Sequence, residues 1–166
     1  MPRMLLFSDV HCDLAAVSRL VEQSHDVDIA VGAGDFANMG SGLQSTINAL
    51  SDLACPTILM PGNGERFDAL NAATSDWPAA QVLHGTGACV AGVNFFGIGG
   101  GIPQTPFGEL SYDFSEAEAQ HLLADCAKWL CADVESSSTN EPSVFVTHSP
   151  ALGLLDVSSK GASIGS

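Results

Sequence analysis

Residues Ile58 to Glu65 read ILMPGNGE, a short apolar run that ends in a sharp turn. Proline fixes the backbone angle φ, whereas glycine and asparagine tolerate positive φ, so Pro-Gly and Asn-Gly pairs are strong turn signals. The pattern predicts a strand from Thr57 to Met60, followed by a tight loop. Within that loop Asn63 has two interpretations: it is a turn residue, or its side-chain carbonyl holds a ligand at the end of the strand.

Similar short apolar runs precede this strand, and helical patterns separate them. Residues 4–7 and 28–33 read as strands, while apolar residues recur at helical spacing within 14–21 and 43–54. A short Ala-rich helical segment follows at 65–73. Strands that alternate with helices form a parallel sheet with right-handed crossovers. The first part of the chain therefore predicts a βαβαβ unit.

The second half of the chain has a different pattern. Residues 81–100 are rich in β-formers and glycine, which predicts short antiparallel strands and turns. Ser115-x-x-Glu118 is a capping box that opens a helix, and residues 144–146 read as a last strand. We therefore predict an α/β fold with two facing mixed sheets flanked by helices, in a single domain that spans residues 1–166.

Polar side chains follow the strands at the point where each strand ends. Because ligands bind outside the carboxyl ends of parallel strands, these side chains are expected to converge. They are Asp9, His11, Asp35, Asn63 and His148. Carboxylates, imidazoles and an amide oxygen suit Mn²⁺, Fe, Zn²⁺ or Mg²⁺, and the lack of a thiolate argues against a structural zinc site. Each residue alone has an ordinary interpretation, as a helix cap, a turn residue or a core histidine, but five together favour a metal site.

These residues also match, in order and spacing, the motifs of a known family. Asp9-Val10-His11, Gly34-Asp35, Gly62-Asn63-Gly64-Glu65 and Thr147-His148-Ser149-Pro150 resemble four motifs of the calcineurin-like metallophosphoesterases, namely D-x-H, G-D, G-N-H-[DE] and a strand-end histidine. The resemblance covers nearly the whole chain. It implies a metallophosphoesterase-like four-layer sandwich, in which the two sheets lie between helices.

The resemblance also implies a dinuclear metal site with Mn²⁺ as the favoured ion and Fe, Zn²⁺ or Mg²⁺ as alternatives. Asp35 would bridge the two ions, Asp9 and His11 would complete one side, and Asn63 and His148 the other. Two such ions clamp a phosphate ester and lower the pKa of a bridging water. The implied reaction is hydrolysis of a phosphomonoester or phosphodiester by attack of the bridging hydroxide. On this reading Asn63 is a metal ligand.

One departure from the family lies at Gly64, where the family often has a histidine that protonates the departing alkoxide. Glycine has no proton to donate, so general-acid help worth ~10²–10⁴ in rate is missing. We expect slower turnover, or a preference for good leaving groups such as aryl phosphates or phosphodiesters. Glu65 is the candidate substitute, and with Asp35 and Asn63 it completes the set of candidate catalytic residues.

A second departure is that the final G-H-x-H motif, which normally supplies one histidine to each metal, does not occur. The resemblance implies that the C-terminal strand or strands of the fold are missing from this chain. Metal binding would then be weaker, and an unpaired strand edge would favour association, for example into a homodimer. Of the other histidines, His25 and His121 are expected to be exposed, and His84, which precedes a glycine turn, is the better candidate for a further ligand.

The composition narrows the range of partners. The net charge is −14 with only five lysines and arginines in 166 residues. Such a surface repels phosphate backbones, which argues against nucleic acid and for a small phosphate-ester substrate. No apolar run approaches the ~18 residues of a membrane span, and the N-terminus does not resemble a signal peptide, so we expect a cytoplasmic protein without membrane contact.

The sequence alone leaves two other classes of protein as alternatives. A non-catalytic scaffold of the same fold is favoured by Gly64 and by the absent final motif, whereas the five intact ligands favour the enzyme. A serine or cysteine hydrolase is disfavoured because no G-x-S-x-G elbow occurs, and because the neighbouring Cys12 and His11 need not form a nucleophile–base pair.

Overall fold

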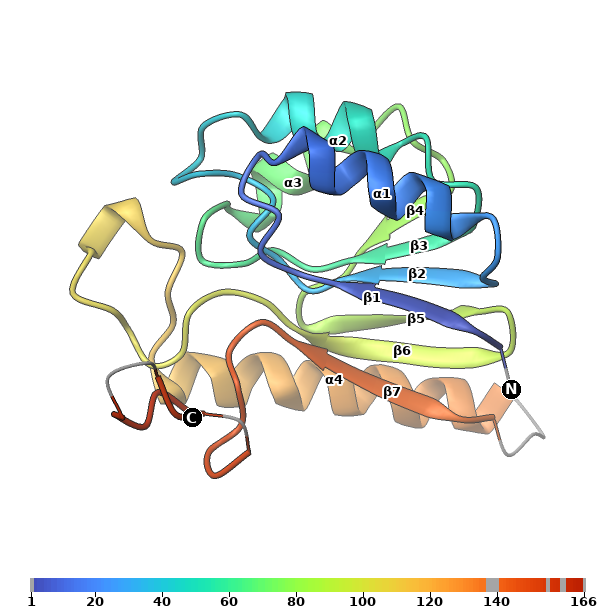
Figure 1. Ribbon diagram of the computed structural model, residues 1–166. Helices are drawn as coiled ribbons and strands as arrows, with labels where there is room; N and C mark the ends of the chain where they lie inside the picture. The colour runs from blue at the N-terminus through green and yellow to red at the C-terminus, as the bar shows by residue number, and fades with distance from the viewer. Residues whose placement is uncertain (1, 137–140, 155, 159–160, 166) are drawn as a thin grey trace.

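The computed structural model describes residues 2–136, 141–154, 156–158 and 161–165, in which two sheets lie face to face between two layers of helices (Figure 1). The first sheet is parallel and has the strand order β1-β2-β3-β4; its strands are β1 (Met4–Phe7), β2 (Ile29–Gly32), β3 (Thr57–Leu59) and β4 (Ala80–Val82). The second sheet has the order β5-β6-β7, with strands β5 (Thr86–Val90), β6 (Val93–Ile98) and β7 (Ser143–Thr147).

Helices cover the outer face of each sheet (Figure 1). Three short helices lie on the first sheet, namely α1 (Leu14–Ser24), α2 (Leu43–Leu50) and α3 (Phe67–Ala73), and the long α4 (Glu116–Ser136) lies on the second. A single 3-10 turn, η1 (Gly108–Leu110), interrupts the loop before α4. The predicted α/β architecture of two facing sheets flanked by helices is confirmed.

Apolar side chains fill the space between each pair of layers. The inner layer, between the sheets, joins Ile58 and Met60 from one sheet to Phe95 and Val146 from the other. Outer layers lie between the first sheet and helices α1 to α3, and between the second sheet and α4. The central strands β2 and β3 are therefore packed on both faces, which explains their nearly continuous apolar sequences.

Side-chain caps open two of the helices, α1 and α4. Asp13 caps α1, since its Oδ1 accepts hydrogen bonds from the backbone N–H groups of Ala15 (2.9 Å) and Ala16 (3.0 Å). At the start of α4, the backbone N–H of Glu118 donates to Ser115 Oγ (3.3 Å), and the backbone N–H of Ser115 donates to the Glu118 carboxylate (2.8 Å). This is the predicted capping box.

One strand differs from its prediction. Residues 81–100 were expected to form antiparallel strands, but β4 pairs in parallel with β3, with Thr57 opposite Ala80. The reason is α3, which acts as another crossover and returns the chain to the first sheet. Only β5 and β6 form the expected antiparallel hairpin, whose turn residues Ala91 and Gly92 both have positive φ (49° and 73°).

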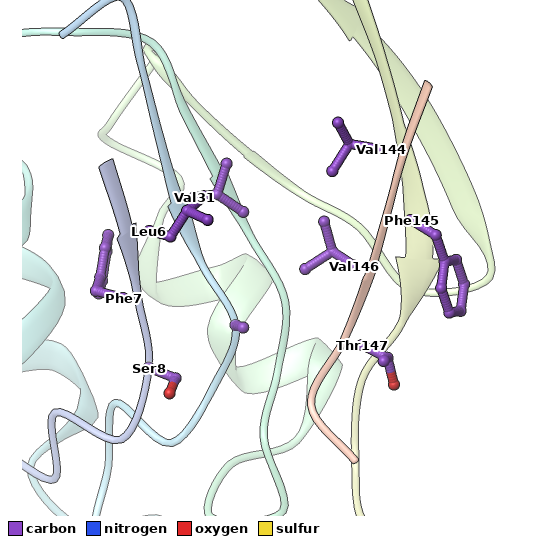
Figure 2. A pocket seen from close by; sticks show the side chains of 9 residues that line it. Leu6, Phe7, Ser8, Val31, Val144, Phe145, Val146 and Thr147 are labelled. Carbon is purple, nitrogen blue, oxygen red and sulfur yellow. The ribbon is translucent and has the colours of Figure 1, made fainter. Parts of the chain in front are cut away.

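The strands β1 and β7 lie at the edges of their sheets and face each other across a hollow of about 480 Å³. Figure 2 shows Val144 and Val146 of β7 pointing towards the first sheet, whereas Phe145 points away from it. Across the hollow, Leu6 of β1 is 67% exposed. Within the described ranges neither β1 nor β7 has a strand partner on its outer side. None of the described helices is both long and apolar enough to cross a membrane.

Candidate metal centre

The five strand-end residues lie together at the carboxyl ends of β1, β2, β3 and β7. Asp9 and His11 are in the loop after β1, and Asp35 follows β2. Asn63 follows β3, and His148 comes directly after β7. The parallel order of β1, β2 and β3 places the first three loops side by side, while β7 brings its histidine from the second sheet. The site therefore lies where the two sheets meet.

Left-handed backbone conformations shape the first two loops. Asp9, His11 and Asp35 have φ angles of 55°, 45° and 58°. Residues with a Cβ rarely adopt this region, and each such residue costs on the order of 1 kcal/mol or more. Hydrogen bonds hold the loops in place: the N–H of Asp9 donates to Gly34 O (2.9 Å) and the N–H of His11 donates to Asp35 O (2.9 Å). Strain of this kind concentrates at functional sites, where surrounding contacts fix it.

One group of potential ligands consists of Asp9, His11 and Asp35. The His11 Nε2 lies 3.7 Å from Asp9 Oδ1 and 3.6 Å from Asp35 Oδ2. Their donor atoms all lie within 4.8 Å of one another. Ligand atoms bound at about 2.0–2.2 Å to one ion lie roughly 3.0–3.5 Å apart, so the three donors need only small movements to hold an ion.

A second group lies on the other side of Asp35. His148 Nε2 is 3.6 Å from Asp35 Oδ1 and 3.2 Å from Asn63 Oδ1. The two oxygens of the Asp35 carboxylate therefore face different groups, Oδ2 towards His11 and Oδ1 towards His148. Asp35 is only 7% exposed, so its carboxylate is largely shielded from solvent where it lies between the two imidazoles.

The two imidazoles are oriented by backbone carbonyls. His148 Nδ1 lies 2.8 Å from Ala33 O, and His11 Nδ1 lies 3.3 Å from Ala37 O. A carbonyl oxygen only accepts, so each ring forms this hydrogen bond in the tautomer that carries its proton on Nδ1. Neutral imidazoles then carry their lone pair on Nε2, the atom that faces Asp35 in both cases. This arrangement prepares both rings to bind a cation.

The Asn63 side chain is oriented by residues that the sequence analysis did not single out. Its Nδ2 donates to Ser111 Oγ (2.9 Å), and Ser111 Oγ donates to Asp113 Oδ1 (2.6 Å). Burial raises the pKa of Asp113, but hydrogen bonds from Ser111 and Thr105 outweigh that effect and leave the pKa below its ordinary value. The ionised Asp113 accepts the hydrogen bond of the Ser111 hydroxyl, so Ser111 Oγ is left to accept from Asn63 Nδ2. The Asn63 amide oxygen then faces His148. No local motif signals the pair Ser111 and Asp113.

Glu65 lies beneath the site and is only 2% exposed. Its Oε1 accepts hydrogen bonds from the N–H groups of Asp35 (2.9 Å) and Gly62 (2.7 Å), and its Oε2 accepts one from Ala37 (3.0 Å). Burial raises the pKa of the Glu65 carboxyl, and these backbone donors oppose the rise. Both oxygens are engaged in tying the loop after β2 to the loop after β3. The geometry therefore favours a positioning role for Glu65 over the general-acid role.

The glycines beside Asn63 permit a close approach of the two loops. A Cβ on Gly62 would lie 2.1 Å from Asp35 Oδ1 and 2.3 Å from the Asp35 nitrogen, so no side chain fits there. At Gly64 a Cβ would lie 3.1 Å from both Asp35 Oδ1 and Ala37 O, which is tight but less severe. The N–H of Gly64 also donates to Asp35 Oδ1 (2.7 Å) and so orients the shared carboxylate.

The other histidines do not join the site. His25 and His121 are exposed, as expected. His84 packs between aromatic rings, with its centroid 5.6 Å from that of Phe67, and its Nδ1 accepts a hydrogen bond from the N–H of Gly99 (3.1 Å). Burial lowers its pKa to about 4, so the ring is neutral at pH 7. His84 is thus a packing residue with satisfied polar atoms.

Cys12 has ordinary partners as well. Its Sγ lies 3.3 Å from Ser41 O and 3.7 Å from Phe36 O, and its backbone has a positive φ of 64°. The thiol therefore donates to backbone carbonyls in a tight turn. This geometry does not support a cysteine nucleophile paired with His11.

The strand-end site thus combines carboxylates, imidazoles and an amide oxygen, which are donor types that divalent cations bind. The chain belongs to the calcineurin-like phosphoesterase family, whose sequence profile matches residues 2–164. This family consists of phosphoesterases that depend on divalent metal ions. The donor set of this chain fits such ions, because hard oxygens and imidazole nitrogens predominate and no thiolate belongs to the Asp9–His11–Asp35 cluster.

Two solved structures illustrate the likeness of fold. The crystal structure of TT1561 of Thermus thermophilus has a TM-score of 0.74 and 19% sequence identity, over 91% of this chain and 69% of that one. A second crystal structure also has a TM-score of 0.74, with 16% identity over 100% of this chain and 77% of the other. At these identities the likeness concerns the fold alone. No curated protein sequence matches the chain.

Proposed function

We propose that the protein is a dinuclear metal-dependent phosphoesterase that hydrolyses small phosphate esters, with Mn²⁺ as the favoured ion. One observation carries the proposal: the two carboxylate oxygens of Asp35 face two separate groups of ligands. A carboxylate needed only for structure has no reason to lie between two imidazoles whose Nε2 atoms are both directed towards it.

Each side chain has a distinct role in this proposal. Asp9, His11 and Oδ2 of Asp35 would hold one ion, and Oδ1 of Asp35, Asn63 and His148 would hold the other. When bound, a pair of divalent ions supplies Lewis acidity at the phosphate and lowers the pKa of a water molecule. The backbone carbonyls that accept from the two Nδ1 atoms keep the rings oriented throughout.

The residues at positions 64 and 65 do not supply a proton to the departing alcohol. Gly64 carries no acid, and the nearby Glu65 is buried with both oxygens bonded to backbone N–H groups. We therefore infer slow turnover of alkyl esters and preference for alcohols that leave without a proton, such as phenols. The net charge of −14 favours small substrates over nucleic acid.

Calorimetric titration with Mn²⁺ tests the ligand assignment. We expect two binding sites in the natural chain, loss of both in Asp35→Asn, and retention of one in His148→Asn. The exposed Asp76→Asn is the matched control and should leave both sites intact. A single site in the natural chain, or unchanged binding in Asp35→Asn, would contradict the dinuclear assignment.

A second assay separates an enzyme from a non-catalytic scaffold, the alternative that the glycine at position 64 favours. We expect Mn²⁺-dependent hydrolysis of bis(4-nitrophenyl) phosphate that disappears in Asp35→Asn. Two bound ions without hydrolysis of this activated ester would favour the scaffold, because its leaving group needs no acid.

A further inference from the structure

A second feature of the molecule lies beside the metal ligands, on the side of Gly64. A hollow of about 220 Å³ opens there, and its wall includes Asn63, Gly64 and Arg66. Asn63 belongs both to this hollow and to the second ligand group, so the hollow adjoins the candidate ligands. The rest of the wall is largely apolar and includes Met39, Leu43, Leu110 and Tyr112.

Two of the apolar side chains in this wall are exposed. Met39 is 61% and Leu110 67% exposed, and they come from separate loops, one after β2 and one before α4. The loop of Met39 is fixed to the site, because the N–H of Gly40 donates to Gly64 O (2.6 Å). Met39 itself has a φ of 46°, a costly conformation for a residue with a side chain. Exposed apolar side chains that flank a concave site mark it as a ligand-binding surface.

The charges of the hollow suit a group that is itself uncharged. Arg66 is the one cation in its wall, and its guanidinium carbon lies 5.2 Å from the centroid of the Tyr112 ring. Its Nε lies 3.5 Å from Asp68 Oδ1. The acids in the wall are Glu65, whose oxygens are bonded to backbone N–H groups, and Glu109. A further anionic group would meet little compensation here, whereas an aromatic ring could pack against the apolar side chains of Met39 and Leu110.

We propose that this hollow, which we call the Met39–Leu110 pocket, binds a compact aromatic group esterified to the phosphate. The inference rests on the proposed function and adds the substrate class to it: aryl rather than small alkyl or polyanionic phosphate esters. It agrees with the absence of an acid at Gly64, since a phenol is a good leaving group and an aromatic ring is what the pocket would hold.

The test compares two phosphonates that share one head group. Calorimetry measures the binding of methylphosphonate and of phenylphosphonate to the Mn²⁺-loaded protein. Burial of a phenyl ring in an apolar pocket predicts about tenfold tighter binding of phenylphosphonate. In Leu110→Ala this preference should fall to about threefold or less, with methylphosphonate affinity unchanged. Leu152→Ala is the control, because Leu152 is similarly exposed (69%) but lies outside the pocket.

The outcomes separate this inference from the proposed function. Equal affinity for the two phosphonates would overturn the pocket assignment and leave the phosphoesterase proposal standing. The same holds if the preference survives in Leu110→Ala but disappears in Ile164→Ala, because Ile164 lines a different hollow, of about 500 Å³, beside Asp9 and His148. Failure of both phosphonates to bind would overturn both proposals.

Discussion

Replacement of Glu65 tests how the centre is held together. In Glu65→Gln the amide oxygen can still accept from the N–H groups of Asp35 and Gly62, but its NH₂ group would face the N–H of Ala37. One buried donor then loses its acceptor, at a cost of about 2 kcal/mol. Glu65→Ala removes the acceptor of all three donors, so we expect a loss of about 4 kcal/mol.

Urea unfolding and thermal melting, both followed by circular dichroism, measure these losses. A domain of this size shifts its Tm by about 2–4 °C per kcal/mol, so Glu65→Gln should melt about 4–8 °C below the natural chain. The exposed Glu22→Gln is the matched control and should change stability by no more than about 0.5 kcal/mol. Equal stability of the natural chain and Glu65→Gln would show that the three backbone donors do not depend on the carboxylate, contrary to this prediction.

Three further substitutions test other parts of the site and core. Gly62→Ala should abolish Mn²⁺ binding in calorimetry, because its Cβ would lie 2.1 Å from Asp35 Oδ1. Gly64→His should raise the rate of alkyl phosphate hydrolysis about tenfold or more if the imidazole reaches the leaving oxygen, and no gain would contradict the general-acid argument. Burial holds the pKa of His84 near 4, below the ordinary 6.5, so the unfolded chain binds the proton more tightly and stability falls as pH drops from about 6.5 towards 4. Urea unfolding at pH 7 and pH 5 should show a loss of about 1–2 kcal/mol from this group, which His84→Gln removes and the exposed His25→Gln does not.

Much of the fold could be predicted from the sequence because its signals are local. The predicted strand at residues 4–7 coincides with β1, and the predicted helix and strand patterns up to residue 73 correspond to α1, β2, α2, β3 and α3. Apolar periodicity and turn residues reflect interactions between residues close in sequence, so they can be recognised without knowledge of the rest of the chain. The convergence of the five candidate ligands could be predicted for a related reason, since a residue at the end of a parallel strand has a known place in space.

The pairing of strand β4 is a feature that local sequence patterns did not predict. Its three residues, Ala80 to Val82, carry no pattern that distinguishes a parallel from an antiparallel partner. Its place in the first sheet depends on the crossover through α3 and on pairing with β3, both of which lie outside the segment itself.

The alternation of strands and helices and the identity of the strand-end side chains are encoded in local sequence patterns. The orientation of those side chains depends instead on contacts between distant parts of the chain. The Asn63 amide is turned by Ser111, 48 residues away, and His148 is oriented by the carbonyl of Ala33, 115 residues away. Glu65 likewise meets its backbone partners because the fold brings the loop after β3 against the loop after β2. Such contacts depend on which loops the packed sheets bring together, and a linear pattern does not contain that information.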